Sequence, residues 1–361
     1  MLAILAVIPL YFSATVCVAA DGELVVIGEK AVYRYAYPEI GQIFGELYLK
    51  EADSVVDDIC YSEKVVPKNA RIAVDSNGVI SVKEGVPGKI VDRAKLKADV
   101  SDALAVGGGT VRVRFTDLMP EICAEDLKDC TFLRGSFTTS FYSDKDRITN
   151  IRLATRLLNG TMVGDNEIFS FNDTVGERTE RRGFKTAKII VNGNFVEGVG
   201  GGVCQASTTL YNCSLLSGLE AVEHHRHSLA VSYVEKSFDA MVSGSSSDLK
   251  FRNNTGKPVF IFGKTDCNSV TFSIYGRKND YSVVRESVIL KEITPSVSTV
   301  KNKELAFGET RVLVFPKTGY CSEAYLNYYK DGKLVRRTKI REDVYHAVNG
   351  ITEVGENDAE N

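Results

Sequence analysis

Short runs of alternating apolar and polar residues fill the first third of the chain, which is the pattern of half-buried β-strands. The runs that predict strands lie at residues 23–27, 31–35, 70–75, 78–82 and 110–115. Residues 92–104 instead repeat apolar side chains every three or four positions, which predicts an amphipathic helix that Asp92 can cap. We therefore expect a small α+β module at residues 21–132.

The same patterns divide the rest of the chain. A second amphipathic helix is predicted at 145–158, where Asn159 and Gly160 end it. Beyond Ser247 the chain contains successive runs that predict strands, and these lie at 249–252, 258–262, 270–275 and 280–290. Pro295 marks a linker to a last, glycine-punctuated β-module at 295–355, which an acidic tail at 356–361 follows.

Size and composition agree with several folded domains. The 361 residues exceed the roughly 250–300 residues at which one hydrophobic core stops growing. Apolar residues make up 44% and charged residues 25%, which is ordinary for globular proteins, and the formal net charge is -3. This charge supplies no basic field for a nucleic-acid backbone, so we expect no nucleic-acid partner. The predicted fold class is α+β, multi-domain and strand-rich.

Residues 2–20 carry no charge, and Asp21 is the first charged side chain. The segment is long enough to span a bilayer, while Ala19 and Ala20 supply the small residues of a signal cleavage site. Residues 1–20 therefore predict a signal peptide or an N-terminal anchor. Either places residues 21–361 outside the cytoplasm, with membrane contact only through this segment if it stays uncleaved.

Eight cysteines leave seven after the N-terminal segment, an odd number for an oxidising compartment. Cys123 and Cys130 could close a local loop, while Cys267 and Cys321 sit in β-like runs. These pairings stay open, but one thiol is expected to remain unpaired.

The strongest chemical signal is the run from 198 to 211, where three glycines precede Val203 and Cys204. Glycines allow left-handed backbone angles and the close approach of a substrate. A helix is predicted from about 205 to 217, ended by Gly218. A cysteine at its start feels the positive end of the helix dipole, which favours the thiolate, and free amides there can stabilise an oxyanion.

Helical geometry separates Cys204 from Cys213. At about 100° per residue, nine positions put Cys213 on the opposite side, with Ala206 and Leu210. Cys213 is therefore predicted to be core, while Cys204 is presented on the side of Thr208 and Tyr211. The alternative for Cys204 is half of a disulfide or a small buried residue.

A nucleophilic thiol needs a base, and three of the four histidines lie in the run 224–227. A predicted strand at 221–234 puts His225 and His227 on one face, so either can serve, and Asp239 can orient the imidazole. The alternatives are a solvated edge strand or a zinc site. We predict no metal and no cofactor, because zinc would need the nucleophilic thiol as its third ligand.

Several separated motifs resemble the VanW family. They are the run 169–179, Gly183-Phe184, the run 200–212, Gly218-Leu219-Glu220, His225-Arg226-His227-Ser228 and Asp239-Ala240. The resemblance runs from about residue 135 to residue 262, within a predicted domain at 135–290. Residues 21–132 are similar to a peptidoglycan-binding domain, and 295–355 resemble a divergent G5 domain of surface proteins.

The resemblance implies a protein of the bacterial cell wall, from a family named after glycopeptide (vancomycin) resistance clusters. It also implies an L,D-transpeptidase that uses Cys204 on peptidoglycan stem peptides, with His227 or His225 as base and Asp239 beside it. Arg178 is the candidate for a substrate carboxylate. Further candidates for substrate contact are Thr179, Gly201, Gly202, Gln205, Thr208 and Tyr211. The alternative is a non-catalytic protein that binds peptidoglycan or teichoic acid.

Overall fold

The computed structural model describes residues 8–9, 23–36, 46–75, 79–105, 108–142, 144–191, 194–244 and 246–355. These residues form two compact units, Met1–Arg71 with Val82–Asp126 and Ile72–Ser81 with Leu127–Asn361. Apart from β1 (Ile8–Pro9), the predicted signal or anchor lies outside the described residues, as does the acidic tail. No helix among the described residues is long and apolar enough to cross a membrane.

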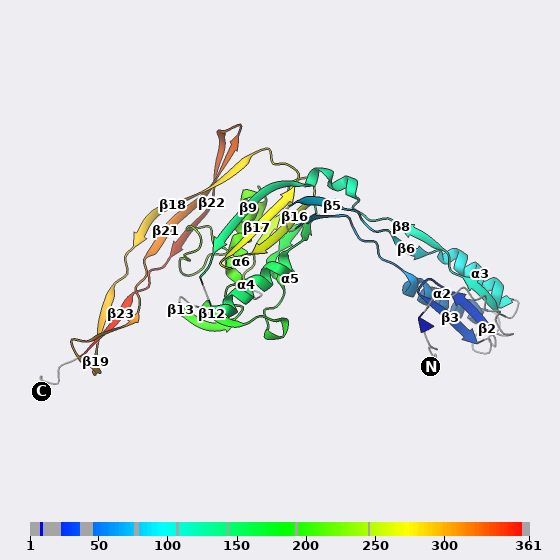
Figure 1. Cartoon of the computed structure of the whole chain (residues 1–361), viewed down its shortest axis with the longest axis horizontal. Helices are drawn as coiled ribbons and strands as arrows, with labels where there is room; N and C mark the ends of the chain where they lie inside the picture. Colours follow the sequence, from blue (N-terminus) through cyan, green and yellow to red (C-terminus); the bar gives the residue numbers. More distant parts are fainter. Residues whose placement is uncertain are drawn as a thin grey trace. The chain divides into compact units, whose positions relative to one another are not determined.

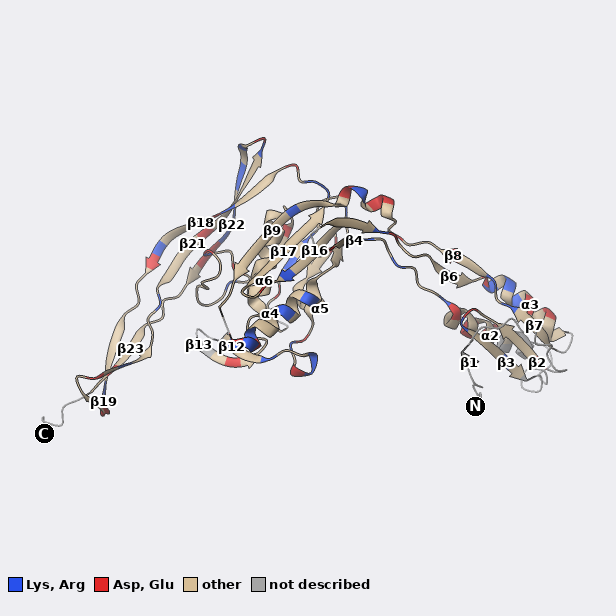
Figure 2. Cartoon of the chain, in the orientation of Figure 1, with Lys and Arg blue, Asp and Glu red and all other residues tan. Residues whose placement is uncertain are grey.

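In the first unit a small sheet carries two helices (Figure 1). β2 (Glu23–Ile27) pairs antiparallel with β3 (Ala31–Ala36) and parallel with β7 (Gly109–Arg112), and β1 pairs with β3. The predicted helix is confirmed as α3 (Arg93–Ala105), with Leu96, Val100 and Leu104 buried. The basic residues of α3 lie in its first half and the acidic residues in its second half (Figure 2).

Two features of this unit differ from the sequence prediction. α2 (Glu46–Glu63) was not predicted, although its buried residues Ala52, Val56 and Ile59 lie at helical spacing. The predicted strand at 110–115 is divided, since β7 ends at Arg112 and β8 (Phe115–Leu118) pairs with β6 (Gly88–Val91). The predicted 70–75 and 78–82 runs form β4 (Arg71–Val74) and β5 (Ile80–Lys83), most of which groups with the second unit.

The last residue of α2 holds the turn between β2 and β3. The fully buried Glu63 carboxylate accepts hydrogen bonds from the amides of Glu29 (3.1 Å), Lys30 (3.0 Å) and Ala31 (3.2 Å). It also accepts one from the Tyr33 hydroxyl, at 2.9 Å. A buried carboxylate with this many donors ties the hairpin to the helix.

We expect Glu63→Ala to lower the free energy of unfolding by about 2–4 kcal/mol, because it leaves the buried amide of Ala31 and the partly buried amides of Glu29 and Lys30 without their acceptor. Urea titrations of the full chain followed by circular dichroism measure this change. The matched control is Glu29→Ala, which removes an exposed carboxylate paired with Lys89. Equal destabilisation by the two variants would refute the role given to Glu63.

The second unit is built on an antiparallel sheet in the order β10-β16-β17-β9. Its strands are β9 (Phe132–Ser140), β10 (Thr161–Val163), β16 (Val259–Thr265) and β17 (Ser269–Gly276). β17 shows strict alternation, with Val270, Phe272 and Ile274 buried. α4 (Lys145–Leu158) packs against β16, and α6 (Val203–Leu216) packs against β9 and β17. The predicted helix at 145–158 is confirmed residue for residue.

Smaller elements surround this sheet. They are η1 (Ala124–Cys130), β11 (Ile168–Ser170), α5 (Phe171–Val175), η2 (Glu180–Arg182), β12 (Thr186–Val191), β13 (Asn194–Val199), β14 (Glu220–Glu223) and β15 (Lys250–Arg252). β15 lies between β11 and β14 in a second sheet, while β12 and β13 form a hairpin that the sequence patterns did not predict.

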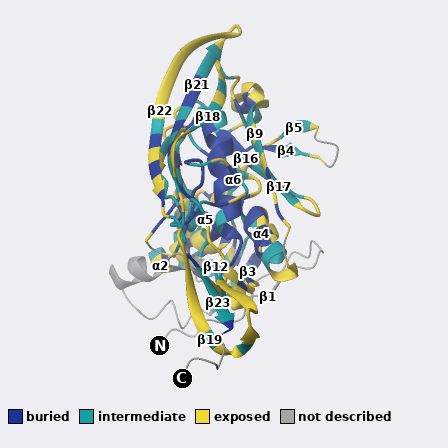
Figure 3. Ribbon diagram, turned by 90° about the vertical axis from the view of Figure 1, so that its left-hand side faces the viewer, coloured by how far each residue is buried: buried dark blue, intermediate teal, exposed yellow. Residues whose placement is uncertain are grey.

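The predicted strand at 221–234 is wrong beyond Glu223, where β14 ends. From His224 the chain leaves the sheet and runs without regular structure over α6. Its backbone is held by side chains instead, since Ala240 N donates to Thr208 and Phe238 O accepts from Asn212. α6 is therefore buried almost all round, as Figure 3 shows.

The chain ends in a C-terminal module, residues 282–355, built from two three-stranded sheets. One sheet contains β18 (Ser282–Ile293), β21 (Gly319–Lys330) and β22 (Lys333–Tyr345), and the other contains β19 (Val297–Phe307), β20 (Thr310–Val314) and β23 (Gly350–Gly355). Because β18 pairs along its length with β21, the predicted boundary between 290 and 295 falls inside this module. Ala324 and Leu326 of β21 join the same hydrophobic core as α4 and α6. The predicted α+β, strand-rich, multi-domain class with an all-β C-terminal part is confirmed.

Candidate active site

Cys204 lies in the first turn of α6, directly after a backbone kink made by glycines. Gly202 caps the helix with φ +105°, and Gly200 has φ +90°, both left-handed angles that favour glycine. Gly201 packs so tightly that a Cβ would lie 2.7 Å from the Lys188 carbonyl oxygen. The glycine run thus lets the helix begin just before Cys204, which places the thiol at the positive end of the helix dipole.

A buried histidine–aspartate pair lies beside this cysteine. Asp239 Oδ2 accepts two hydrogen bonds from His227, one from its amide and one from its ring Nδ1, both at 2.6 Å. The His227 side chain lies close enough to Cys204 to lower the pKa of the thiol, and the thiol in turn raises the pKa of His227. Because Nδ1 is engaged by Asp239, the other ring nitrogen is the one available to Cys204. The Cys204 thiol also donates to the Val242 carbonyl oxygen at 3.3 Å.

The three side chains shift one another's pKa toward their charged forms. Burial alone would lower the pKa of His227, but the hydrogen bond to Asp239 and the nearby Cys204 thiol more than offset it and raise the value to about 9. Burial would raise the pKa of Cys204, yet His227 and the charge of Arg178 hold it below its ordinary value. The pKa of Asp239 falls to about 2 despite burial, because His227 and Arg341 stabilise the carboxylate. The arrangement favours a thiolate–imidazolium pair.

The structure separates the two histidines that the sequence left as alternatives. The ring of His225 hydrogen-bonds to Glu223, at 2.9 Å, and is more than a third exposed. His224 stacks on Tyr211, and burial lowers its pKa to about 4. The expectation that His225 and His227 share a strand face is wrong, since no strand exists there. His227 is the histidine beside Cys204.

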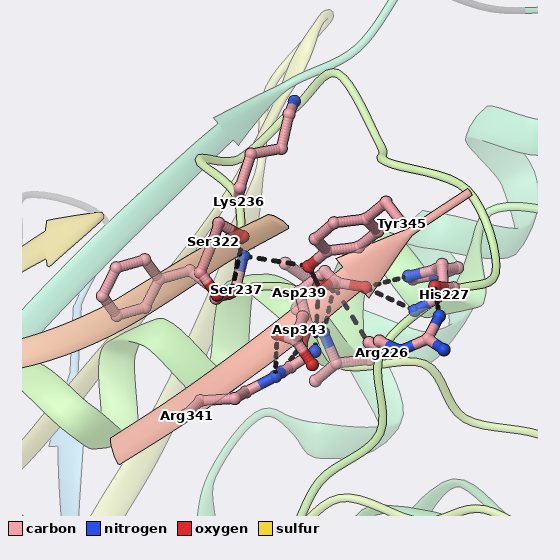
Figure 4. Close-up of polar contacts among 12 residues, drawn as sticks. Arg226, His227, Lys236, Ser237, Asp239, Ser322, Arg341, Asp343 and Tyr345 are labelled. Carbon is pink, nitrogen blue, oxygen red and sulfur yellow. Dashed lines mark hydrogen bonds and ion pairs between the residues drawn. The ribbon is translucent and has the colours of Figure 1, made fainter. Parts of the chain in front are cut away.

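The oxygen of Asp239 that His227 does not use is held by the C-terminal module (Figure 4). Asp239 Oδ1 accepts from Tyr345 Oη at 2.5 Å and from Arg341 Nη2 at 3.1 Å, and both residues lie on β22. Sequence reasoning missed them. The end of β22 reverses the usual burial pattern of a strand, because Arg341, Asp343 and Tyr345 are buried while Val344 is 41% exposed. This inverted alternation is the feature that could have pointed to these two residues.

Arg178 lies near Cys204, and its guanidinium makes few hydrogen bonds. Its Nη2 donates to Asn172 Oδ1 at 2.5 Å, and its guanidinium lies 5.8 Å from the centre of the Phe171 ring. Its buried Nε has no hydrogen-bond partner among the described residues. Thr179 follows it and begins the short helix η2. Arg178 therefore retains a free donor close to the thiol.

The other predicted substrate contacts are structural in this arrangement. Thr208 and Tyr211 are fully buried, because the segment after His224 covers the face of α6 that the sequence presented to solvent. Gln205 is buried as well, and its side chain donates to Thr139 and to the Ser140 carbonyl oxygen. Gly201 and Gly202 are buried by packing. These five residues differ from their predicted role, since they place Cys204 rather than line an open surface.

The remaining cysteines do not pair. The seven cysteines in the described part of the chain, Cys204 included, form no disulfide, so neither the Cys123–Cys130 nor the Cys267–Cys321 pairing is present. Cys213 is confirmed as a core residue, and burial raises its pKa to about 12. Over the same residues, no cluster of three or more His, Cys, Asp or Glu is placed to hold a metal ion.

The candidate site is therefore a cysteine at a helix start beside a buried His–Asp pair, within a strand-rich multi-domain chain. Family models identify its parts: residues 146–275 match "VanW like protein", 284–357 match "G5 domain" and 46–112 match "Putative peptidoglycan binding domain". The chain therefore has the domain architecture of the VanW family, as the sequence motifs predicted. This combination associates it with the cell wall.

Two curated relatives match about half of the chain. The uncharacterized protein YoaR of Bacillus subtilis (strain 168) is 37% identical over 171 residues, 47% of this chain and 56% of that protein. The vancomycin B-type resistance protein VanW of Enterococcus faecalis is 24% identical over 163 residues, 44% of this chain and 59% of that protein. The matches thus span less than two thirds of either relative. The G5 domain structure of an IgA1 protease covers 22% of this chain at 20% identity, with a TM-score of 0.16.

The pKa directions predict the pH dependence of thiol reactivity. We expect Cys204 to react with iodoacetamide well below pH ~8.5, because His227 remains protonated and stabilises the thiolate. His227→Ala should move the midpoint of this pH–rate profile up by about 1–3 pH units. The measurement is peptide mass spectrometry of Cys204 alkylation at each pH.

Two internal comparisons make this test specific. The exposed Cys123 reports general thiol reactivity in the same samples, and His225→Ala removes a histidine whose partner is Glu223. A profile of Cys204 that His225→Ala shifts and His227→Ala leaves unchanged would contradict the assignment.

Proposed function

We propose that this chain cross-links peptidoglycan stem peptides by cysteine-dependent acyl transfer, as an L,D-transpeptidase does. The observation that carries the proposal is the buried hydrogen bond of His227 with Asp239, beside the Cys204 thiol whose pKa His227 lowers. A buried thiolate–imidazolium pair is the activated form that cysteine acyltransferases need.

The chemistry follows from the groups present. The Cys204 thiolate attacks the carbonyl carbon of the third residue of a tetrapeptide stem and forms a tetrahedral oxyanion. The imidazolium of His227 gives its proton to the amine of the departing D-alanine, which leaves a thioester on Cys204. An amine of a neighbouring stem then attacks the thioester, His227 takes up the proton of that amine, and the thiolate returns.

An oxyanion donor is available where the thiol begins its attack. The amides of Val203 and Gln205 donate to the carbonyl oxygens of Gly200 and Gly202. The amide of Cys204 itself is the candidate donor, since it belongs to the same first turn.

Arg178 is the candidate for recognising the terminal carboxylate of the stem. It lies close enough to Cys204 to lower the pKa of the thiol, and its Nε is buried without a partner. A carboxylate there would satisfy this donor in a charge-assisted hydrogen bond. The proposed partners are accordingly peptidoglycan stem peptides, with glycan contacts from the flanking modules, in an extracytoplasmic setting.

We predict that Cys204→Ala abolishes dimer formation from isolated tetrapeptide-bearing muropeptides while the protein stays folded. Cys213→Ala is the matched control, because it removes a buried thiol from the same helix. It should cost about 1–2 kcal/mol of stability and retain turnover. The measurements are mass spectrometry of the muropeptides and thermal unfolding of each variant.

The alternative is a wall-binding protein without catalysis. Dimers formed by Cys204→Ala, or no dimers and no acyl adduct on Cys204 with the unaltered chain, would reject the transpeptidase and favour this alternative. Retention of the unaltered chain, Cys204→Ala and Cys213→Ala on purified cell walls would then support wall binding as the function.

A further inference from the structure

The C-terminal module contacts the catalytic aspartate of the proposed site and not merely the surface of the domain. Asp239 is only 1% exposed, and its carboxylate needs partners for both oxygens. His227 supplies both donors to Oδ2, while Oδ1 is held by Arg341 and Tyr345 of β22. Arg341 Nη1 also donates to the backbone oxygen of Asp239, at 2.5 Å.

The same strands shape the backbone that carries Asp239. Ser237 has φ +63°, a left-handed angle that is uncommon for serine. Its amide donates to Tyr345 Oη at 2.9 Å, and its hydroxyl lies 2.8 Å from that of Ser322 on β21. Tyr345 therefore accepts from the loop and donates to the carboxylate with one hydroxyl group (Figure 4).

A third strand of the module contacts the helix that carries Cys204. Arg285 of β18 donates to Asn212 Oδ1 at 2.5 Å, and its guanidinium lies 4.7 Å from the ring centre of Phe238. Asn212 in turn donates to the Phe238 carbonyl oxygen at 2.7 Å. The loop that ends at Asp239 is thus held between α6 and the module.

We propose that the C-terminal module completes the active site, with Arg341 and Tyr345 as positioning residues that fix Asp239 and, through it, His227. The module is then required for reactivity at Cys204, in addition to any contact it makes with the wall. This inference rests on the Cys204–His227–Asp239 arrangement of the proposed function, but not on the identity of the acyl donor.

The test uses Tyr345→Phe, which removes one hydroxyl without changing charge, and Arg341→Met in the full chain. The titratable and charged groups that share this environment are His227, Arg341, Tyr345, Asp343, Tyr211, Arg178, Cys204, Tyr233 and His224. We expect each variant to lower the rate of Cys204 alkylation at pH 7 about three- to tenfold and to move the midpoint of the pH–rate profile up accordingly. Arg341→Lys should recover part of the rate, since it restores a cationic donor.

Matched substitutions on the exposed side of the same sheet separate positioning from stability. Arg337→Met removes a guanidinium paired with Glu286, and Tyr325→Phe removes a hydroxyl bonded to Glu323. Neither should change the alkylation profile. If Arg341→Met does not fold, Tyr345→Phe and Arg341→Lys carry the test.

The outcomes distinguish this inference from the proposed function. Folded Tyr345→Phe and Arg341→Lys proteins with the unaltered pH profile would overturn the inference, while a profile that depends on His227 would leave the Cys–His pair standing. Absence of any His227 dependence would overturn both. A shifted profile in a protein that forms no muropeptide dimers would support the inference and reject the transpeptidase.

Discussion

The buried carboxylate of Asp239 is the constraint on which the site depends. A charged group with almost no exposure to water costs several kcal/mol unless its oxygens are hydrogen-bonded. Four donors satisfy it, two from His227 and one each from Arg341 and Tyr345. These donors come from an irregular segment and from a strand about a hundred residues later, so satisfying one carboxylate brings both parts against α6.

This packing explains why the pKa of the Cys204 thiol is lowered although the side chain is largely enclosed. Burial by itself raises the pKa of a cysteine, as Cys213 on the same helix shows. Cys204 differs because its position in the first turn gives it the helix dipole, and because His227 keeps a proton beside it. Two cysteines nine residues apart in one helix therefore have pKa values shifted in opposite directions.

The sequence predicted the parts of the site that depend on local pattern. The bounds of α4, the placement of Cys204 in the first turn of α6 and the core role of Cys213 follow from helical period and glycine chemistry. The need of a base for an orienting group predicted that Asp239 contacts an imidazole, but the choice of His227 over His225 came only from the structure.

The predictions that were wrong concern residues whose partners lie far away in the sequence. The strand beyond Glu223 was overextended because alternation cannot reveal that Thr208 and Asn212 of α6 hold that segment instead. For the same reason Thr208 and Tyr211 were assigned to substrate contact. Arg341 and Tyr345 lie 102 and 106 positions from Asp239, so no local window could connect them.

The most direct test of the charged Cys204–His227 pair is an NMR titration of the histidine rings, which is tractable because the chain has only four histidines. The account predicts that His227 keeps its proton to a pKa of about 9 and that Cys204→Ala lowers this value, because the partner thiolate is gone. A ring of His227 that titrates near ~6.5 in the unaltered protein, and equally in Cys204→Ala, would contradict it.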